Sequence, residues 1–190
     1  EIKKLTHRGI ILGICSKNNE TDALEVIERH PQMVLRRDDF TIMKINWGDK
    51  VTSLREIAQE LNIGLDSMVY IDDSPVEREW VRRELPEVLT VDLPSDPALF
   101  CRILRELDVF ERACISVEDQ ARTQIYRAQV KRKQLEQESD SLEAFYRHLE
   151  MAAMNGVSAG NGHHTMDILL IQLMQGAGVK IRWWMYLHTT

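Results

Sequence analysis

Residues 69–77, with the sequence Val-Tyr-Ile-Asp-Asp-Ser-Pro-Val-Glu, constrain the fold of this chain more than any other segment. Three apolar residues that end at Asp72 and Asp73 predict a buried strand, and Ser74 with Glu77 predicts a capped helix start. Parallel α/β sheets bind ligands at the carboxyl ends of their strands. Adjacent carboxylates repel unless a cation or a lysine lies between them. The pair therefore indicates either a divalent-metal site or a well-capped strand-end turn.

Short apolar runs alternate with amphipathic segments along the first 107 residues. This alternation is typical of βαβ units and a parallel sheet, so we expect an α/β fold, a three-layer Rossmann-like sheet followed by a helical extension. The predicted strands are 10–15, 33–35, 42–45, 68–71 and 88–91, and the predicted helices are 22–29, 50–61, 75–85 and 97–107. Gly64 is the expected stop of the second helix.

Composition excludes several classes of protein. The formal net charge of -6 argues against a general nucleic-acid binder. No apolar run reaches the ~18 residues that a membrane span needs, so we expect no membrane partner. The three cysteines, Cys15, Cys101 and Cys114, lack metal-ligand spacing, and reduced thiols in a cytoplasmic protein are the simplest explanation.

The chain divides into three predicted parts. Residues 1–112 form the α/β core, 113–150 a charged helical extension and 151–190 an atypical tail. The charged residues between 117 and 133 are typical of a solvated helix face, and a second helix is expected over 141–149. His163 and His164 have no nearby carboxylate or cysteine in the sequence, so a metal site there is disfavoured.

Polar residues lie at three points of the sequence that the predicted parallel sheet brings to one edge. Ser16 and Lys17 follow the first strand, Lys50 opens a helix, and Asp72 and Asp73 end a later strand. In this arrangement Ser16 donates to phosphoryl oxygens, Lys50 neutralises their charge and the carboxylates anchor Mg²⁺. The spacing therefore predicts a phosphate site with a bound cation.

Three segments, 15–20 (Cys-Ser-Lys-Asn-Asn-Glu), 45–50 (Ile-Asn-Trp-Gly-Asp-Lys) and 71–79 (Ile-Asp-Asp-Ser-Pro-Val-Glu-Arg-Glu), resemble the motifs of the haloacid-dehalogenase (HAD) superfamily, and within it the FkbH-like branch. The resemblance covers about residues 1–150. It implies that Mg²⁺ is the cofactor and that Asp73 contacts the metal, while Asp72 supports it and faces Lys50. The substrate-phosphate ligands that it implies are Ser16, Lys17, Asn18 and Lys50.

FkbH-like proteins are glyceryl transferases/phosphatases of polyketide pathways. The resemblance implies a phosphorylated three-carbon substrate, 1,3-bisphosphoglycerate, whose glyceryl group is loaded onto an acyl carrier protein. Cys15 is placed to hold that group as a thioester, and the alternative is a buried core cysteine. Two other functions stay open: a generic Mg²⁺-dependent phosphatase of a small metabolite, and a non-catalytic HAD fragment that binds a partner.

The chain departs from the family at two places. The first HAD motif, Asp-x-Asp, is absent, together with the central strand that carries it between strands 10–15 and 68–71. Each unpaired buried backbone group costs ~1–3 kcal/mol, so we expect a fragment that is poorly folded or pairs these two strands directly. Residues 151–190 also differ from the family, and indicate either a frameshift near Met151 or a genuine alternative C-terminus such as a docking helix.

Overall fold

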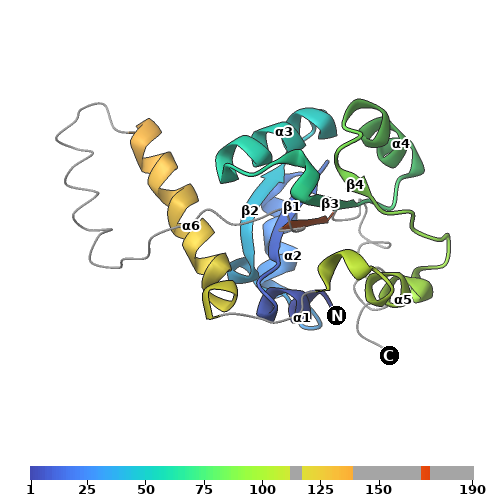
Figure 1. Ribbon diagram of the computed structural model, residues 1–190. Coiled ribbons are helices and arrows are strands. Elements are labelled where there is room, and N and C mark those ends of the chain that lie inside the picture. The colour runs from blue at the N-terminus through green and yellow to red at the C-terminus, as the bar shows by residue number, and fades with distance from the viewer. Residues whose placement is uncertain (112–116, 139–167, 172–190) are drawn as a thin grey trace.

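The computed structural model describes residues 1–111, 117–138 and 168–171 (Figure 1). Its sheet has five strands in the order β2-β1-β5-β3-β4, and every neighbouring pair is parallel. The α/β class with a Rossmann-like parallel sheet is therefore confirmed. The strands are β1 (Ile11–Ser16), β2 (Phe40–Ile45), β3 (Met68–Ile71), β4 (Leu89–Thr90) and β5 (Ile168–Ile171).

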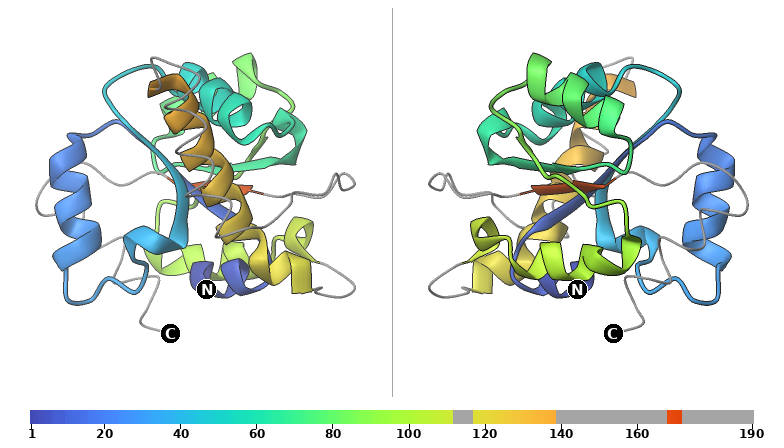
Figure 2. Two further views of the ribbon diagram at one scale, coloured as in Figure 1. Left: turned by 90° about the vertical axis from the view of Figure 1, so that its left-hand side faces the viewer. Right: turned by 90° about the vertical axis from the view of Figure 1, so that its right-hand side faces the viewer.

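Helices cover both faces of the sheet and make the predicted three layers (Figure 2). They are α1 (Ile2–His7), α2 (Glu20–Arg29), α3 (Lys50–Leu61), α4 (Pro75–Glu84), α5 (Phe100–Arg105) and α6 (Val117–Glu138). Side chains of α1, α2 and α5 pack on one face with Leu12 and Val69, whereas α3 and α4 pack on the other with Ile11 and Tyr70. Because strand side chains alternate between faces, β1 and β3 supply both apolar layers.

The central strand of the sheet comes from the segment that the sequence assigned to an atypical tail. Residues 168–171 pair with β1 on one side and with β3 on the other, so that Ile171 lies opposite both Ile14 and Ile71. The expectation that β1 and β3 pair directly, or stay unpaired, is wrong. Ile-Leu-Leu-Ile is apolar at every position, which suits a strand buried on both faces, and three of its residues are fully buried.

Several local predictions need correction. Residues 33–35 are not a strand, although Met33 and Leu35 are buried in the core. Helix α3 ends at Leu61, and its C-cap is Asn62, whose φ of 54° is left-handed, rather than Gly64; asparagine is the other residue that tolerates this conformation at a helix end. The helix predicted over 97–107 is a 3₁₀ turn at 97–99 followed by α5.

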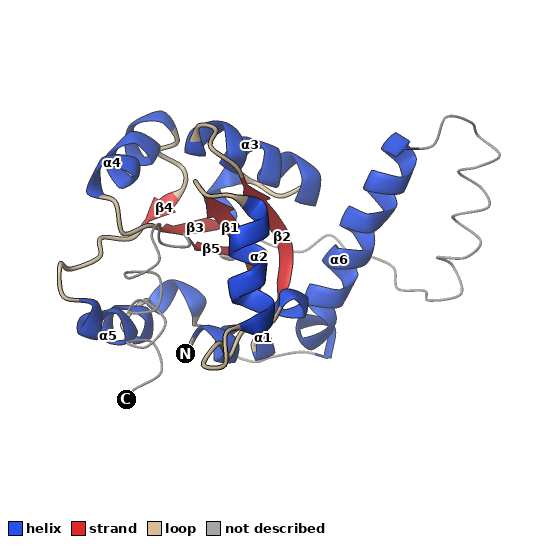
Figure 3. Cartoon of the chain, turned by 180° about the vertical axis from the view of Figure 1, so that it is seen from behind, coloured by secondary structure: helices blue, strands red, loops and turns tan. Residues whose placement is uncertain are grey.

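Helix α6 confirms a helical segment within the charged extension, and lies beside the outer edge of β2 (Figure 3). The helix predicted over 141–149 and the histidines His163 and His164 lie outside the described residues. Among the described residues, no helix is long and apolar enough to cross a membrane.

Candidate functional site

The candidate site lies where β1 and β3 end and where α3 and α4 begin. Ser16 closes β1, and its carbonyl accepts a hydrogen bond from the backbone N–H of Asn46 at 3.0 Å. Ser16 and Asn18 are both buried, and Asn18 is 5% exposed. The Asn18 Oδ1 accepts the N–H of Asn19 at 2.9 Å. Its Nδ2 has no partner among the described residues, so this buried donor is left for a ligand oxygen.

Lys50 is the first residue of α3, after Asp49, whose side chain accepts the N–H of Thr52. Its side chain points into the protein, so that only 1% of the residue is exposed. The Nζ donates to the carbonyl of Cys15 and lies 3.6 Å from Asp72 Oδ2. Burial lowers the pKa of Lys50, and the negative charge of Asp72 opposes that change. The predicted approach of Lys50 to Asp72 is therefore present.

Asp72 is fully buried, and both of its carboxylate oxygens face protein donors. Oδ1 accepts the N–H of Ser74 at 2.8 Å. Oδ2 accepts the Tyr70 hydroxyl and is also the oxygen nearest Lys50. Burial raises the pKa of Tyr70, which keeps its proton on the hydroxyl. These contacts suit a carboxylate that orients its neighbours, and direct metal contact by Asp73 remains a prediction.

Asp73 is half-buried beside Asp72, and its pKa is raised by burial first and by the Asp72 charge second. A cation near Asp73 would relieve both effects. Arg78 of α4 supports this turn from behind, because its Nη1 donates to the carbonyls of Asp72 at 2.8 Å and Asp73 at 3.0 Å. Sequence reasoning missed Arg78 and Tyr70. Their only signal was proximity to the aspartates.

Lys17 forms a 2.6 Å ion pair with Glu77, which places it beside the N-terminus of α4. The Ser74 hydroxyl caps α4 by accepting the N–H of Glu77 at 3.3 Å, as predicted. The Glu77 carboxylate lies against Lys17, and no return hydrogen bond to the Ser74 N–H completes the predicted capping box among the described contacts. The role of Lys17 as a phosphate ligand remains a prediction.

Cys15 is fully buried, and its thioester role remains a prediction. Its side chain lies in the apolar layer beneath α3, beside Val51 and Tyr70, and is fully buried. Burial raises the pKa of the thiol to about 11, which suppresses the thiolate. Its full burial in the apolar layer fits the alternative of a core cysteine.

Asp72 and Asp73 suit Mg²⁺ better than a metal ion that takes all of its ligands from protein side chains. No group of three or more His, Cys, Asp or Glu side chains with metal-site geometry occurs among residues 1–111, 117–138 and 168–171. Mg²⁺ keeps several waters and is often held by one or two carboxylates together with substrate phosphate. Asp73, together with the neighbouring Asp72, supplies the one or two carboxylates that such a Mg²⁺ site needs.

The end of β5 differs from the site that the HAD resemblance implies. β5 occupies the position of the strand that carries Asp-x-Asp in that superfamily, between β1 and β3. The sequence after Ile171 continues Gln172-Leu173-Met174 and so supplies no carboxylate. β5 therefore fills the position of the Asp-x-Asp strand in the sheet, but the residues that follow β5 include no aspartate in place of that motif.

A comparison with solved structures found one similar to this chain, the crystal structure of the N-terminal part of protein BF1531 from Bacteroides fragilis, which contains a phosphatase domain complexed with Mg. The TM-score is 0.58 and the sequence identity 48%, over 60% of this chain and 30% of that chain. This chain thus spans less than a third of that structure. No protein-family model and no curated protein matches this chain. The likeness supports the predicted HAD-type fold.

Proposed function

We propose that this chain is a Mg²⁺-dependent phosphatase domain of the HAD superfamily that acts on a small phosphorylated molecule. The observation that carries the proposal is the buried Lys50–Asp72 pair beside Asp73, at the end of a parallel strand. The Mg-complexed phosphatase domain of the similar structure supports the same reaction class. The unpartnered Asn18 Nδ2 supports a phosphate ligand.

The residues of this chain bind and orient the phosphoryl group in this proposal. Ser16 and Asn18 donate hydrogen bonds to its oxygens, and the Lys50 ammonium offsets their charge. Asp72 fixes Lys50, while Tyr70 and the Ser74 N–H fix Asp72. Mg²⁺, held by Asp73, would supply further charge neutralisation. In hydrolysis a water oxygen bonds to phosphorus and releases a proton, the ester P–O bond breaks, and the leaving oxygen takes up a proton.

Binding and turnover are tested separately. Isothermal titration with Mg²⁺ and inorganic phosphate measures the site, and release of phosphate from p-nitrophenyl phosphate measures turnover. We expect both to require Asp73, so that Asp73→Asn abolishes Mg²⁺ binding and activity. Glu111→Gln, which removes an exposed carboxylate elsewhere, is the matched control and leaves both unchanged. Mg²⁺ binding that survives in Asp73→Asn contradicts the proposal.

The sequence after β5 favours a second candidate function. Because Gln172 follows this strand where HAD enzymes have an acidic nucleophile, the chain would bind a phosphorylated partner without hydrolysing it. Saturable binding of Mg²⁺ and phosphate, together with no phosphate release above the Asp73→Asn background, identifies this binding module. Mg²⁺-dependent release excludes it.

A finer proposal rests on the motif resemblance: glyceryl transfer from 1,3-bisphosphoglycerate to an acyl carrier protein. Its support is the order of the three motifs around residues 15, 50 and 72. The buried Cys15 thiol weighs against the thioester step at that residue. Intact mass spectrometry after incubation with 1,3-bisphosphoglycerate tests it. A glyceryl adduct lost in Cys15→Ala supports transfer through Cys15, and no adduct in the unchanged chain contradicts it.

A further inference from the structure

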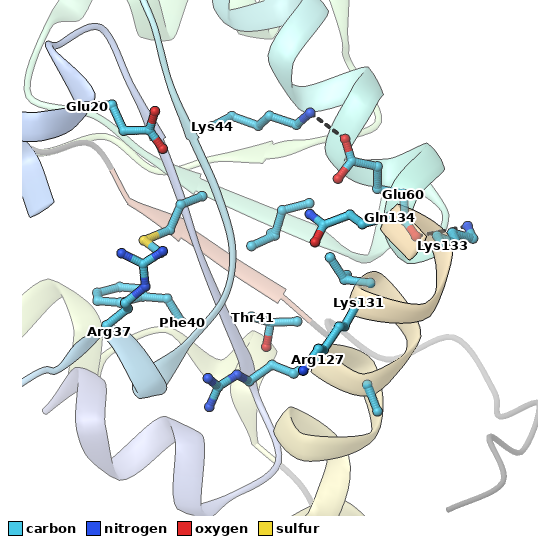
Figure 4. Close-up of a pocket in the computed structure, with 14 residues that line it drawn as sticks. Glu20, Arg37, Phe40, Thr41, Lys44, Glu60, Arg127, Lys131, Lys133 and Gln134 are labelled. Carbon is cyan, nitrogen blue, oxygen red and sulfur yellow. Dashed lines mark hydrogen bonds and ion pairs between the residues drawn. The ribbon is translucent and has the colours of Figure 1, made fainter. Parts of the chain in front are cut away.

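A cavity of about 840 Å³ lies between the outer edge of β2 and helix α6 (Figure 4). Its floor is formed by residues 40–44 of β2 and its far wall by α6. β2 is the terminal strand of the sheet, with β1 as its strand neighbour on one side. The cavity is separate from the candidate phosphate site, which lies at the carboxyl ends of β1 and β3.

Helix α6 is attached on both sides of this cavity. Arg127 donates to the carbonyl of Asp38 at 3.0 Å and to its carboxylate at 2.7 Å. About two turns further on, the Lys133 Nζ donates to the carbonyls of Gln59 and Glu60 at the end of α3. The helix therefore spans the strand edge between two anchor points.

The lining of the cavity is basic although the whole chain is acidic. It contains five basic and two acidic side chains, in a chain whose formal net charge is -6. The basic residues are Arg37, Lys44, Arg127, Lys131 and Lys133, and the acidic ones are Glu20 and Glu60. Carboxylates pair with Arg37, Lys44 and Arg127, so Lys131 and Lys133 are the lining cations without a carboxylate partner among the described residues, and they favour an anionic ligand.

The basic side chains differ in how firmly they are held. Lys44 lies between Glu56 and Glu60, which neutralise it. Arg37 and Arg127 pair with Glu28 and Asp38, whose side chains are 49% and 83% exposed. Exposed ion pairs contribute little, so either arginine can exchange its carboxylate for a ligand at small cost, while Arg127 keeps its hydrogen bond to the Asp38 carbonyl.

Thr41 gives the cavity a polar group that the protein leaves unsatisfied. The register between β1 and β2 shifts here, because Leu12 pairs with Phe40 and Gly13 with Ile42, so Thr41 is the extra residue of a bulge. Thr41 is 7% exposed, and its hydroxyl has no hydrogen-bond partner among the described residues. In Figure 4 the side chains of Arg127 and Lys131 extend from α6 toward Thr41.

We propose that this cavity is a second ligand site, which binds a small molecule through a carboxylate or phosphate group. The Thr41 hydroxyl donates to an oxygen of that group, and Lys131 and Arg127 offset its charge. The volume lies within the range of about 300–1,000 Å³ that is typical of small-molecule sites. The proposal stands independently of the phosphatase activity, because it uses none of the residues of that site.

The test is a titration of the full ¹⁵N-labelled chain with inorganic phosphate, and separately with citrate, at constant ionic strength. We expect saturable amide shifts at Thr41 and Lys131. For whichever of the two anions saturates the shifts, we expect the apparent Kd to rise at least fivefold in Thr41→Val and in Lys131→Glu. It stays unchanged in Thr41→Ser, which keeps the hydroxyl, and in Arg55→Glu, which makes the same charge change on exposed α3. Melting curves of each variant establish that it is folded.

Three outcomes overturn the proposal. Shifts that rise linearly without saturation indicate ionic atmosphere alone, and equal Kd changes in Lys131→Glu and Arg55→Glu indicate a general charge effect. The third outcome is a Thr41 shift that saturates with a Glu-Val-Glu-Val-Glu-Val peptide but with neither phosphate nor citrate. It would show that the edge of β2 binds an acidic peptide instead of a small anion. Shifts at Ser16 and Asn18 report the phosphatase site, so failure of one site is distinguished from failure of the other.

Discussion

The Lys50 ammonium lies 3.6 Å from the Asp72 carboxylate, and the two residues are 1% and 0% exposed. Removing one member of such a pair leaves the other as an uncompensated buried charge, at a cost of about 3–5 kcal/mol. We therefore expect Lys50→Met to destabilise the chain by that amount and to abolish phosphate binding. Urea unfolding measures the loss of stability. Arg55→Met on the exposed face of the same helix is the control, and a similar small effect in both variants would contradict the prediction.

Tyr70→Phe tests how Asp72 is positioned. The substitution keeps the ring in the core and removes the hydroxyl that donates to Asp72 Oδ2. Because a buried acceptor loses a donor, we expect a loss of about 1–3 kcal/mol in the free energy of unfolding, together with weaker phosphate binding. Tyr126→Phe, at a half-buried ring on α6, is the matched control. Unchanged stability and binding in Tyr70→Phe would show that the hydroxyl does not position Asp72.

Asp73 makes stability depend on pH in an unusual direction for a carboxylate. Its folded-state pKa is raised, so the charged form is disfavoured in the native protein. This cost is fully present above the folded pKa and disappears as the pH falls toward the ordinary value of 3.8. We expect Asp73→Asn to melt at a higher temperature than the unchanged chain at pH 7 without Mg²⁺, and the difference to vanish near pH 4.

Mg²⁺ provides the companion measurement for Asp73. Ion binding to the native state stabilises it by mass action, so millimolar Mg²⁺ should raise the melting temperature of the unchanged chain at pH 7. The same addition should leave Asp73→Asn unaffected. An equal rise in both proteins would place the ion elsewhere and would remove the metal role from Asp73.

Because β5 is the central strand of the sheet, we expect a core substitution in residues 168–171 to lower the free energy of unfolding strongly. Leu169 is fully buried between β1 and β3, so Leu169→Ala should cost about 2–5 kcal/mol. Leu99, which is 41% exposed, provides the same substitution at the surface and should cost less than about 1 kcal/mol. Equal unfolding midpoints for the two variants would contradict the position of residues 168–171 in the sheet.

Cys15 should resist alkylation in the native protein. Its thiol is fully buried, and burial raises its pKa to about 11, so at neutral pH almost no thiolate is present or reachable. Iodoacetamide labelling followed by peptide mass spectrometry is expected to modify Cys15 only after unfolding. Rapid modification of the folded chain would restore Cys15 as a candidate for the thioester step.

The sequence alone determined the parallel α/β class and the polar corner of the site. Strands such as 68–71 are continuous apolar runs, and Asp72, Asp73 and Ser74 follow one of them directly, so local pattern was sufficient there. Helix α4 follows from Ser74 and Pro75 for the same reason, because capping is a local interaction. Parallel topology predicted that Lys50 and Asp72 lie at one edge of the sheet, and the HAD resemblance implied that the two side chains face each other.

Only the tertiary structure decided which segment fills the centre of the sheet and how Cys15 and Tyr70 are oriented. Ile168–Ile171 is an apolar run that periodicity cannot distinguish from a helix, and its partners lie about 100 residues or more away in sequence. Cys15 and Ser16 are neighbours, yet the period of two in a strand sends their side chains to different faces. Side-chain direction and long-range pairing depend on packing between distant residues, which the local sequence pattern does not contain.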